Sequence, residues 1–227
     1  MDTFSTLLSM LAQPGSELRQ IIGVTLRMSF TSTLISCTVG VLLGSLLGIS
    51  RFRGKGLILR ATHTLMGLPP VLSGLLVFFL LSRSGPLGEY KLLYSVTAMV
   101  VAQVLLITPV ATGLSASFVH ARAPQMEETV KGLGLGRLRY LLYMIYECRT
   151  QLFSVFFTGF GRAISEVGAA QLVGGNVQYK TRVMTTAIVL ETNMGRFEMA
   201  LALGLTLLVI AFVITSLAQI FQEVGNR

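Results

Sequence analysis

The stretch GRAISEVGAA, residues 161–170, places two opposite charges in a segment that is otherwise apolar. Arg162 and Glu166 are four residues apart, so on a helix their side chains lie on one face. Two roles are open to them: a structural ion pair that neutralises both charges, or assistance by Arg162 to an anion that passes along the protein. The sequence favours the ion pair, because a bare guanidinium in such a path would hold an anion too firmly for release.

A second chemical constellation is the Ser115–His120 pair in TGLSASFVH. A serine and a histidine can perform intramembrane hydrolysis when they meet. Five helical residues separate the two side chains by about 140° around the axis, so they point apart and an intramembrane hydrolase is disfavoured. Ser115 is instead expected to pack between helices. With two His and two Cys scattered along the chain, we expect no metal or other cofactor on this chain.

The elements that carry these residues are set by composition. Of the 227 residues, 52% are hydrophobic and 12% are charged, with a mean hydropathy of +0.72. A soluble domain has about 25% charged residues. Spanning a bilayer takes roughly 20 apolar residues, and five segments qualify: 28–50, 61–82, 92–121, 150–173 and 199–222. The sequence predicts an all-α polytopic membrane protein with about five spans in a single domain, residues 1–227.

The distribution of basic residues predicts the orientation in the membrane. With the N-terminus outside, the cytoplasmic segments carry ten Lys and Arg residues and the outer segments six. This positive-inside bias favours an N-out, C-in topology. Residues 1–20 then form an extracytoplasmic interfacial segment, residues 119–149 a cytoplasmic loop, and residues 174–196 an outer segment. Within the outer segment, residues 183–190 are apolar but too short to span, which predicts a partial or re-entrant helix.

The cytoplasmic loop combines helix signals with a glycine break. Pro124 suits the start of a short helix, and Glu127 and Glu128 fall in its first turn, where negative charge complements the helix dipole. After the break, RLRYLLYMIY is expected to form an amphipathic helix that leads into the membrane. The break consists of Gly132, Gly134 and Gly136, which permit positive φ or close backbone approach.

A helical wheel of the fourth span predicts two different faces. Its aromatic side holds Phe153, Phe156, Phe157 and Phe160, which lipid tolerates. The other side must face protein or water, and the hydroxyls of Ser154, Thr158 and Ser165 are the groups expected to face an ion. That polar and small face, within an arc of about 120°, consists of Ser154, Thr158, Arg162, Ser165, Glu166 and Ala169.

The cytoplasmic loop resembles the EAA loop of ATP-binding-cassette importer permeases. Glu128 and Gly134 match the Glu and Gly of that motif, whereas Thr129 and Val130 replace its two alanines, and its final proline is absent. The stretches GLPPVLSGLLVFFLLSRSGPLG and GRAISEVGAAQLVGGN look like permeases for tetrahedral oxyanions. The continuation TRVMTTAIVLETNMGRFEMALALGLTLL is most similar to the tungstate branch of this family.

This resemblance implies a type I importer permease fold with a cytoplasmic coupling helix. It further implies a homodimer in a bacterial or archaeal cytoplasmic membrane, two separate ATPase subunits that bind ATP and Mg²⁺, and an extracytoplasmic oxyanion-binding protein. No nucleic acid is expected as a partner. The residues implied to couple to the ATPase are Glu127, Glu128, Gly132, Gly134, Gly136 and Arg137, and those implied to meet the binding protein are Lys180, Arg182 and Arg196.

The function expected from the resemblance is therefore import of a tetrahedral oxyanion, tungstate first, by a transport subunit that is not itself an enzyme. A molybdate or sulfate permease is the alternative within the family. An ion-coupled secondary transporter is a further alternative, but such proteins usually have inverted repeats and intramembrane coupling carboxylates. This chain has one such acid, Glu166, and no visible repeat.

Overall fold

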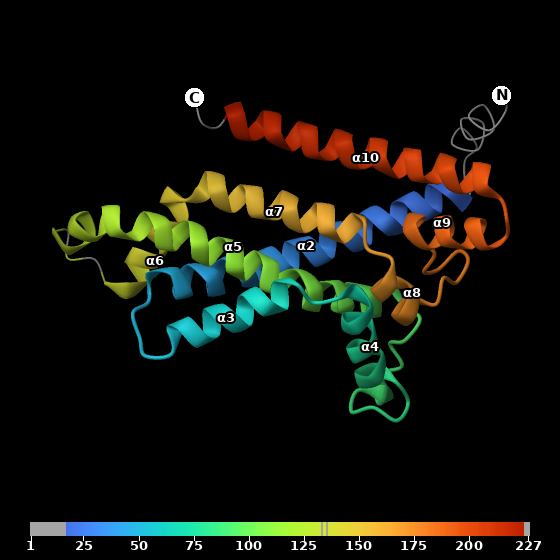
Figure 1. The fold of residues 1–227 in the computed structure, drawn as a ribbon, viewed down its shortest axis with the longest axis horizontal. Helices are drawn as coiled ribbons and strands as arrows, with labels where there is room; N and C mark the ends of the chain where they lie inside the picture. The colour runs from blue at the N-terminus through green and yellow to red at the C-terminus, as the bar shows by residue number, and fades with distance from the viewer. Residues whose placement is uncertain (1–16, 133, 135, 225–227) are drawn as a thin grey trace.

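A computed structural model of the chain describes residues 17–132, 134 and 136–224, without the side chains of 127–129, 131, 217, 218 and 221–224. Residues 1–16 of the expected interfacial segment therefore lie outside the described residues, and residues 17–20 begin the first described helix. All regular elements of the described part are helical. In chain order they are α2 (Glu17–Ile49), α3 (Lys55–Met66), α4 (Pro70–Leu81), the 3₁₀ turn η1 (Gly88–Tyr90), α5 (Val96–Gly132), α6 (Arg137–Glu147), α7 (Arg149–Ile164), α8 (Gly168–Gly174), α9 (Met184–Asn193) and α10 (Phe197–Val224) (Figure 1).

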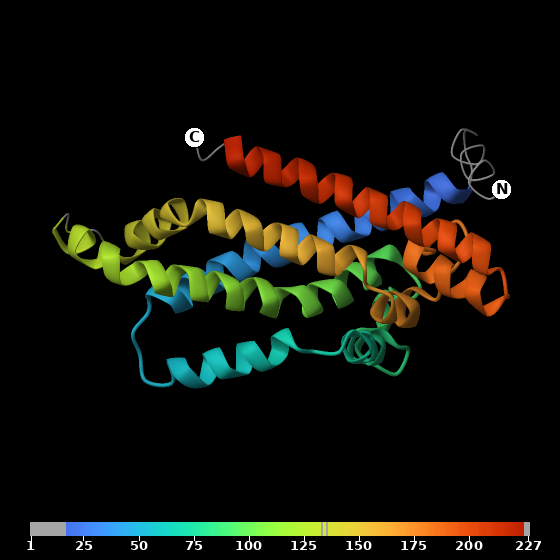
Figure 2. The same cartoon turned by 45° about the horizontal axis from the view of Figure 1, so that its top comes forward.

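The centre of the molecule is a bundle of α2, α5 and α7, which lie side by side along most of their lengths (Figures 1 and 2). Helix α10 lies on one side of this bundle and α3 on the other. α10 begins near the N-terminal end of α2 and runs back along the bundle (Figure 1). We call the end with α4, α8 and α9 the α9 end, and the end with the glycine break the elbow end.

Three described helices are long and apolar enough to cross a membrane: α2, α5 over residues 96–126, and α10. The pair α3 and α4 passes the same test together, which gives up to four candidate spans. α7 has 16 residues and a length of about 24 Å, short of the ~30 Å hydrocarbon core. The expected unbroken spans over 61–82 and 150–173 are therefore wrong, since both segments are broken helices.

The first break separates α3 from α4, which are bent by 99°. Pro70 begins α4, and Pro69 before it has an extended backbone with ψ 131°. A proline has no N–H to continue the preceding helix and pushes the residue before it out of the α region. The Pro69–Pro70 pair thus ends α3 and starts α4 in a new direction.

The second break covers Ser165, Glu166 and Val167, between α7 and α8. The Glu166 carboxylate accepts a hydrogen bond from the Ala169 amide at 2.8 Å, so its side chain satisfies the start of α8. The hydroxyl of Thr185, at the start of α9, donates to the Glu166 carbonyl at 2.8 Å. Glu166 therefore fixes the break instead of continuing the polar stripe of one long helix.

The third span also differs from expectation. α5 continues through Pro109 and Pro124 to Gly132, so Pro124 lies inside a long helix and does not begin a separate short one. The amphipathic helix expected after the glycine break is confirmed as α6, which buries Leu141 and Met144. The short helix expected in the outer segment is confirmed as α9, whose ten residues cannot span a bilayer.

A glycine seam joins α2 to α5. Gly40, Gly44 and Gly48 recur every four residues, so they form one stripe of α2. A Cβ on Gly44 would lie 2.7 Å from the Ser115 Cβ, and one on Gly48 would lie 2.7 Å from Val119. Only glycine permits the two backbones to approach this closely. The seam confirms Ser115 as a packing residue.

Candidate translocation and coupling sites

The glycine break at the elbow end has the geometry that an elbow requires. Gly134 has φ +59°, a conformation that strains residues with a side chain. Gly136 is the N-cap of α6, and Arg137 in the first turn of α6 donates to the Ser50 hydroxyl at the end of α2 at 3.3 Å. The elbow is thereby attached to both α5 and α2. Glu127 lies in the helical part of α5, as does Glu128, but their side chains lie outside the described part.

α6 is also held to the rest of the elbow end. Arg122 of α5 forms an ion pair with Glu147, the last residue of α6, at 3.2 Å. Cys148, between α6 and α7, is 2% exposed. Burial raises the pKa of the Cys148 thiol, and the neighbouring Glu147 raises it further, while Arg122 acts in the opposite direction. The α5–α6–α7 junction is therefore a packed unit at the elbow end.

A buried polar connection crosses the central bundle. Gln103 of α5 is fully buried, and its amide donates to the Ala163 carbonyl of α7 at 2.8 Å. Its side-chain oxygen accepts from the Ser32 hydroxyl of α2 at 2.6 Å. Buried polar groups of this kind specify one arrangement of the helices. The sequence analysis missed Gln103, although a lone amide in a long uncharged segment was a readable signal.

The hydroxyls expected to face an ion lie on the outer side of α7. Thr158 and Ser165 are exposed and Ser154 is partly exposed, whereas Leu152 and Val155 pack into the bundle. Each hydroxyl donates to a carbonyl of its own helix, so its oxygen remains available as an acceptor and its proton can be redirected. The polar face of α7 is thus free for another chain or an aqueous path.

Among the hydrogen bonds of the described residues, the two members of the charged pair have different partners, so the Arg162–Glu166 ion pair stays a prediction. Arg162 donates from Nη2 to the Leu68 carbonyl in the α3–α4 break at 3.3 Å. The Glu166 carboxylate is occupied at the start of α8, where it accepts from Ala169. The two breaks are therefore adjacent, and a Cβ on Gly168 would lie 2.7 Å from Val71 of α4.

The hydrolase alternative has no support in the geometry. Ser115 is buried against Gly44 in the glycine seam, while His120 is exposed on α5. A nucleophile and its base must lie within hydrogen-bond reach of each other. The two side chains face different surroundings, as the helical spacing predicts.

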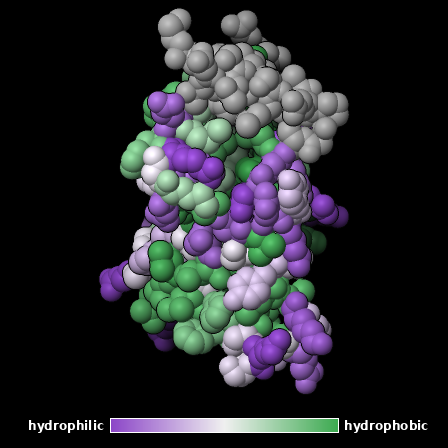
Figure 3. All heavy atoms as spheres, turned by 90° about the vertical axis from the view of Figure 1, so that its right-hand side faces the viewer, coloured by the Kyte–Doolittle hydropathy of each residue, from purple (hydrophilic) through white to green (hydrophobic). Residues whose placement is uncertain are grey.

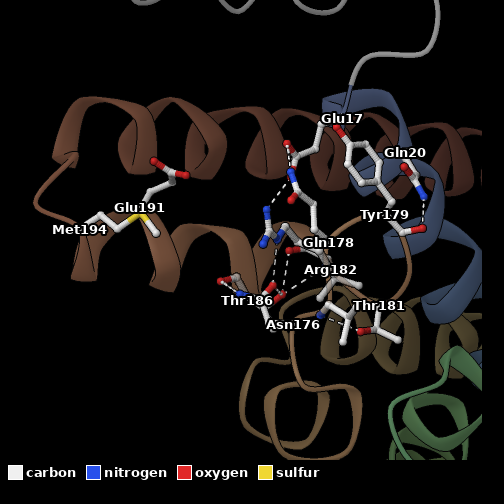
Figure 4. A network of polar contacts seen from close by, with 12 residues as sticks. Glu17, Gln20, Asn176, Gln178, Tyr179, Thr181, Arg182, Thr186, Glu191 and Met194 are labelled. Atoms are coloured by element: carbon white, nitrogen blue, oxygen red, sulfur yellow. Dashed lines mark hydrogen bonds and ion pairs between the residues drawn. The ribbon is translucent and has the colours of Figure 1, made fainter.

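At the α9 end, hydrophilic residues gather across the middle of the surface (Figure 3). A polar network lies there (Figure 4), in which Arg182 forms an ion pair with Glu17 of α2 and donates to the Asn176 side chain at 3.3 Å. Thr186 of α9 also donates to Asn176, at 3.0 Å. This network fastens the loop between α8 and α9 to the start of α2. The sequence analysis did not anticipate Glu17 or Asn176.

Two of the three cations expected to meet a binding protein are held in separate ion pairs. Arg182 is largely covered, and Arg196 forms an ion pair with Glu191 of α9 at 2.7 Å. Lys180 is exposed in the α8–α9 loop beside Tyr179, whose φ is +59°. Of the three, Lys180 is the exposed cation for which the described part of the chain shows no ion pair.

Residues 40–223 match the family described as binding-protein-dependent transport system inner membrane component. The tungstate uptake system permease protein of Peptoclostridium acidaminophilum is 42% identical over 97% of this chain and 96% of its own length. The corresponding protein of Campylobacter jejuni is 40% identical over 71% and 67%, respectively. In fold, the chain resembles a solved bacterial ATP-binding-cassette transporter that imports alginate, with a TM-score of 0.78, 18% identity, and coverage of 98% of this chain and 83% of that one.

Proposed function

Because this chain belongs to the binding-protein-dependent transport system inner membrane component family, we propose that it imports tungstate as the permease subunit of an ATP-driven transporter. The observation that carries the proposal is the 42% identity to a tungstate uptake permease over nearly the whole of both chains. Membership in the family identifies the chain as a transport subunit of the inner membrane, in place of an ion-coupled secondary transporter or an intramembrane hydrolase.

The elbow is the proposed coupling site. Gly132, Gly134, Gly136 and Arg137 form a compact turn at one end of the molecule, attached to the ends of α2, α5 and α6. A separate ATPase that pushes this turn would move three helices of the bundle together. Glu127 and Glu128 precede the turn and complete the proposed docking segment. ATP and Mg²⁺ are assigned to the ATPase, and this chain is proposed to bind neither.

The polar face of α7 is proposed to line the anion path. Ser154, Thr158 and Ser165 are at least partly exposed in the isolated chain, although hydroxyls at this depth need a protein or water neighbour. A second copy of the chain, related by a two-fold axis, would supply the opposite wall. The polar face of α7 is therefore also proposed to face the second copy in a homodimer.

The α9 end is proposed to receive the oxyanion-binding protein. Lys180 is the proposed first contact, while Arg182 and Arg196 set the shape of the surface through their ion pairs with Glu17 and Glu191. This assignment requires the α9 end to be outside and the elbow end inside, with five membrane crossings in which the broken α3–α4 and α7–α8 pairs each count once.

The orientation is tested by cysteines at the two ends. Both native cysteines are buried, so R53C at the elbow end and K180C at the α9 end report on accessibility. A membrane-impermeant maleimide should label K180C in intact cells and R53C only after permeabilisation. The opposite pattern would reverse the topology.

The substrate is tested by uptake in cells that lack this chain. We expect tungstate accumulation, measured by mass spectrometry of the metal, to depend on the chain, with molybdate and sulfate taken up more weakly. Uptake of molybdate or sulfate in preference to tungstate would replace the proposed substrate by the alternative. Tungstate and molybdate are close in size, so the binding protein is proposed to discriminate between them.

A further inference from the structure

The guanidinium of Arg162 is incompletely satisfied within the described part of the chain. Its Nε is buried without a hydrogen-bond partner, and Nη2 has a long bond of 3.3 Å to the Leu68 carbonyl. Glu166, the nearest acid in the sequence, is occupied by the amide of Ala169. Among the described residues, the hydrogen bonds of Arg162 therefore do not reach a carboxylate, and its Nε is left for another group.

An unneutralised charge at this position is costly unless another group meets it. Intramembrane arginines usually face a partner or a water-filled path, and they mark pathways for ions and substrates. A guanidinium presents five N–H donors in a planar fork that matches the oxygens of carboxylates and phosphates. A tetrahedral oxyanion offers the same kind of acceptor together with a negative charge.

The neighbours of Arg162 suit an oxyanion. Thr158 lies one turn before it and Ser165 three residues after it, within about 60° on the same face of α7. Both residues are exposed and carry hydroxyls that can turn toward an anion. On the other side, the α3–α4 break supplies the Leu68 carbonyl, the one hydrogen-bond acceptor that the structure gives the guanidinium.

We propose that Arg162 is a transient oxyanion ligand in the path, with Thr158 and Ser165 beside it. The inference rests on the proposed function and assigns to Arg162 a role that an ion pair would have prevented. The arrangement also allows the anion to be released. The Leu68 carbonyl competes with the anion for Nη2, and the carboxylate of Glu166, four residues away, repels it. Both weaken the hold on a dianion, as conduction requires.

The first test uses charge and shape at Arg162, with Arg27 as a matched control. Arg27 is an exposed arginine of α2. In proteoliposomes with the ATPase and the loaded binding protein, R162Q should lower the maximal tungstate uptake at least tenfold. R162K should retain an intermediate rate, while R27Q and R27K stay within twofold of wild type. The amount of binding protein needed for half-maximal uptake should not change.

The same variants separate this role from a structural one. The melting temperature of R162Q should remain within a few degrees of wild type, so that uptake per folded molecule falls. If R162Q instead melts much earlier but keeps normal uptake per folded molecule, Arg162 is structural and the inference is overturned. Normal uptake with normal stability would overturn it equally.

The second test reads the charge directly and needs no transport. S165C places a thiol three residues from Arg162, and both native cysteines are buried. An anionic methanethiosulfonate should modify S165C faster than a cationic one, and the R162Q background should reduce that ratio at least fivefold. Millimolar inorganic tungstate should slow the modification of S165C when Arg162 is present, but not in the R162Q background. If the ratio is unchanged by R162Q, or tungstate has no effect, the inference fails.

The two failures are distinguishable. If the wild-type complex takes up no tungstate, the proposed function is wrong, while the labelling assay, repeated with sulfate, still decides whether Arg162 binds an oxyanion. If the wild type takes up tungstate and R162Q does so equally well, only the role of Arg162 is wrong.

Discussion

Replacing Gly44 by alanine tests how tightly α2 and α5 are packed. The added Cβ would lie 2.7 Å from the Ser115 Cβ and 2.9 Å from the backbone nitrogen of Ala116. Carbon atoms pack at about 3.5–4.0 Å, so α2 has to withdraw by about 1 Å. A gap of about that size forfeits roughly a quarter to a half of the dispersion energy of each contact that it opens. Because a backbone atom blocks the new group, a side-chain rotation cannot relieve the clash.

Overpacking of this kind costs about 1–3 kcal/mol of unfolding free energy. For a chain of this length, each kcal/mol lowers the melting temperature by about 2–4 °C, so we expect a fall of about 2–12 °C. Gly23 is the matched control on the same helix, since a Cβ there would meet nothing within 4 Å. G23A should be neutral or slightly stabilising, because alanine is the better helix former. Size-exclusion chromatography after heating measures both variants, and equal melting temperatures would refute the seam.

Three further predictions concern the elbow, the charged pair and the buried thiol. G134V should weaken ATPase association and abolish transport with the permease still folded, whereas G54V, at a glycine with φ +96° outside the elbow, should keep the ATPase bound; equal binding by both variants would contradict the docking assignment. E166L orphans a helix N–H at about 1–3 kcal/mol, and adding R162L should leave the melting temperature within a few degrees of that of E166L, whereas a double variant markedly more stable than E166L would restore the ion pair. Burial raises the pKa of Cys148, so the unfolded chain releases this proton at a lower pH than the folded chain and stability falls as the pH rises above the ordinary thiol range. C148S should remove that part of the fall in melting temperature between pH 7 and 10, and an identical pH profile would contradict the assignment.

Hydropathy predicted the long membrane helices, and the glycine pattern predicted the bend at the elbow. The length of an apolar segment is set by membrane thickness, so the helices corresponding to α2, α5 and α10 were found with shifted ends. Gly134 was predicted to bend the chain because only glycine adopts a positive φ without strain, and its φ of +59° confirms this.

The breaks were missed for two different reasons. The Pro69–Pro70 pair indicates a helix break, but residues 61–82 are apolar over a length sufficient to cross a bilayer, so hydropathy predicted one unbroken span. The break at Glu166 could not be read in the same way, since a carboxylate four residues from an arginine suggests an ion pair equally well. Which group it accepts from depends on α8 beginning at Gly168, which is a property of the packed structure.

The α2–α5 seam and the Gln103 connection fall between these cases. The spacing of Gly40, Gly44 and Gly48 is the small-residue repeat of closely packed membrane helices, and it could have predicted a helix contact. It could not have named α5 as the partner. Gln103 likewise predicts a buried hydrogen bond, because its amide lies in a long apolar segment. The sequence does not identify its partners, which are the Ser32 hydroxyl and the Ala163 carbonyl.

The most direct test of the proposed function is tungstate accumulation in proteoliposomes that contain this chain with its ATPase and its extracytoplasmic binding protein. We predict accumulation that requires ATP, the binding protein and this chain together, and that persists when ion gradients are collapsed. Accumulation driven by an ion gradient without ATP, or ATP hydrolysis with no tungstate in the lumen, would contradict the assignment of this chain as the permease of a tungstate importer.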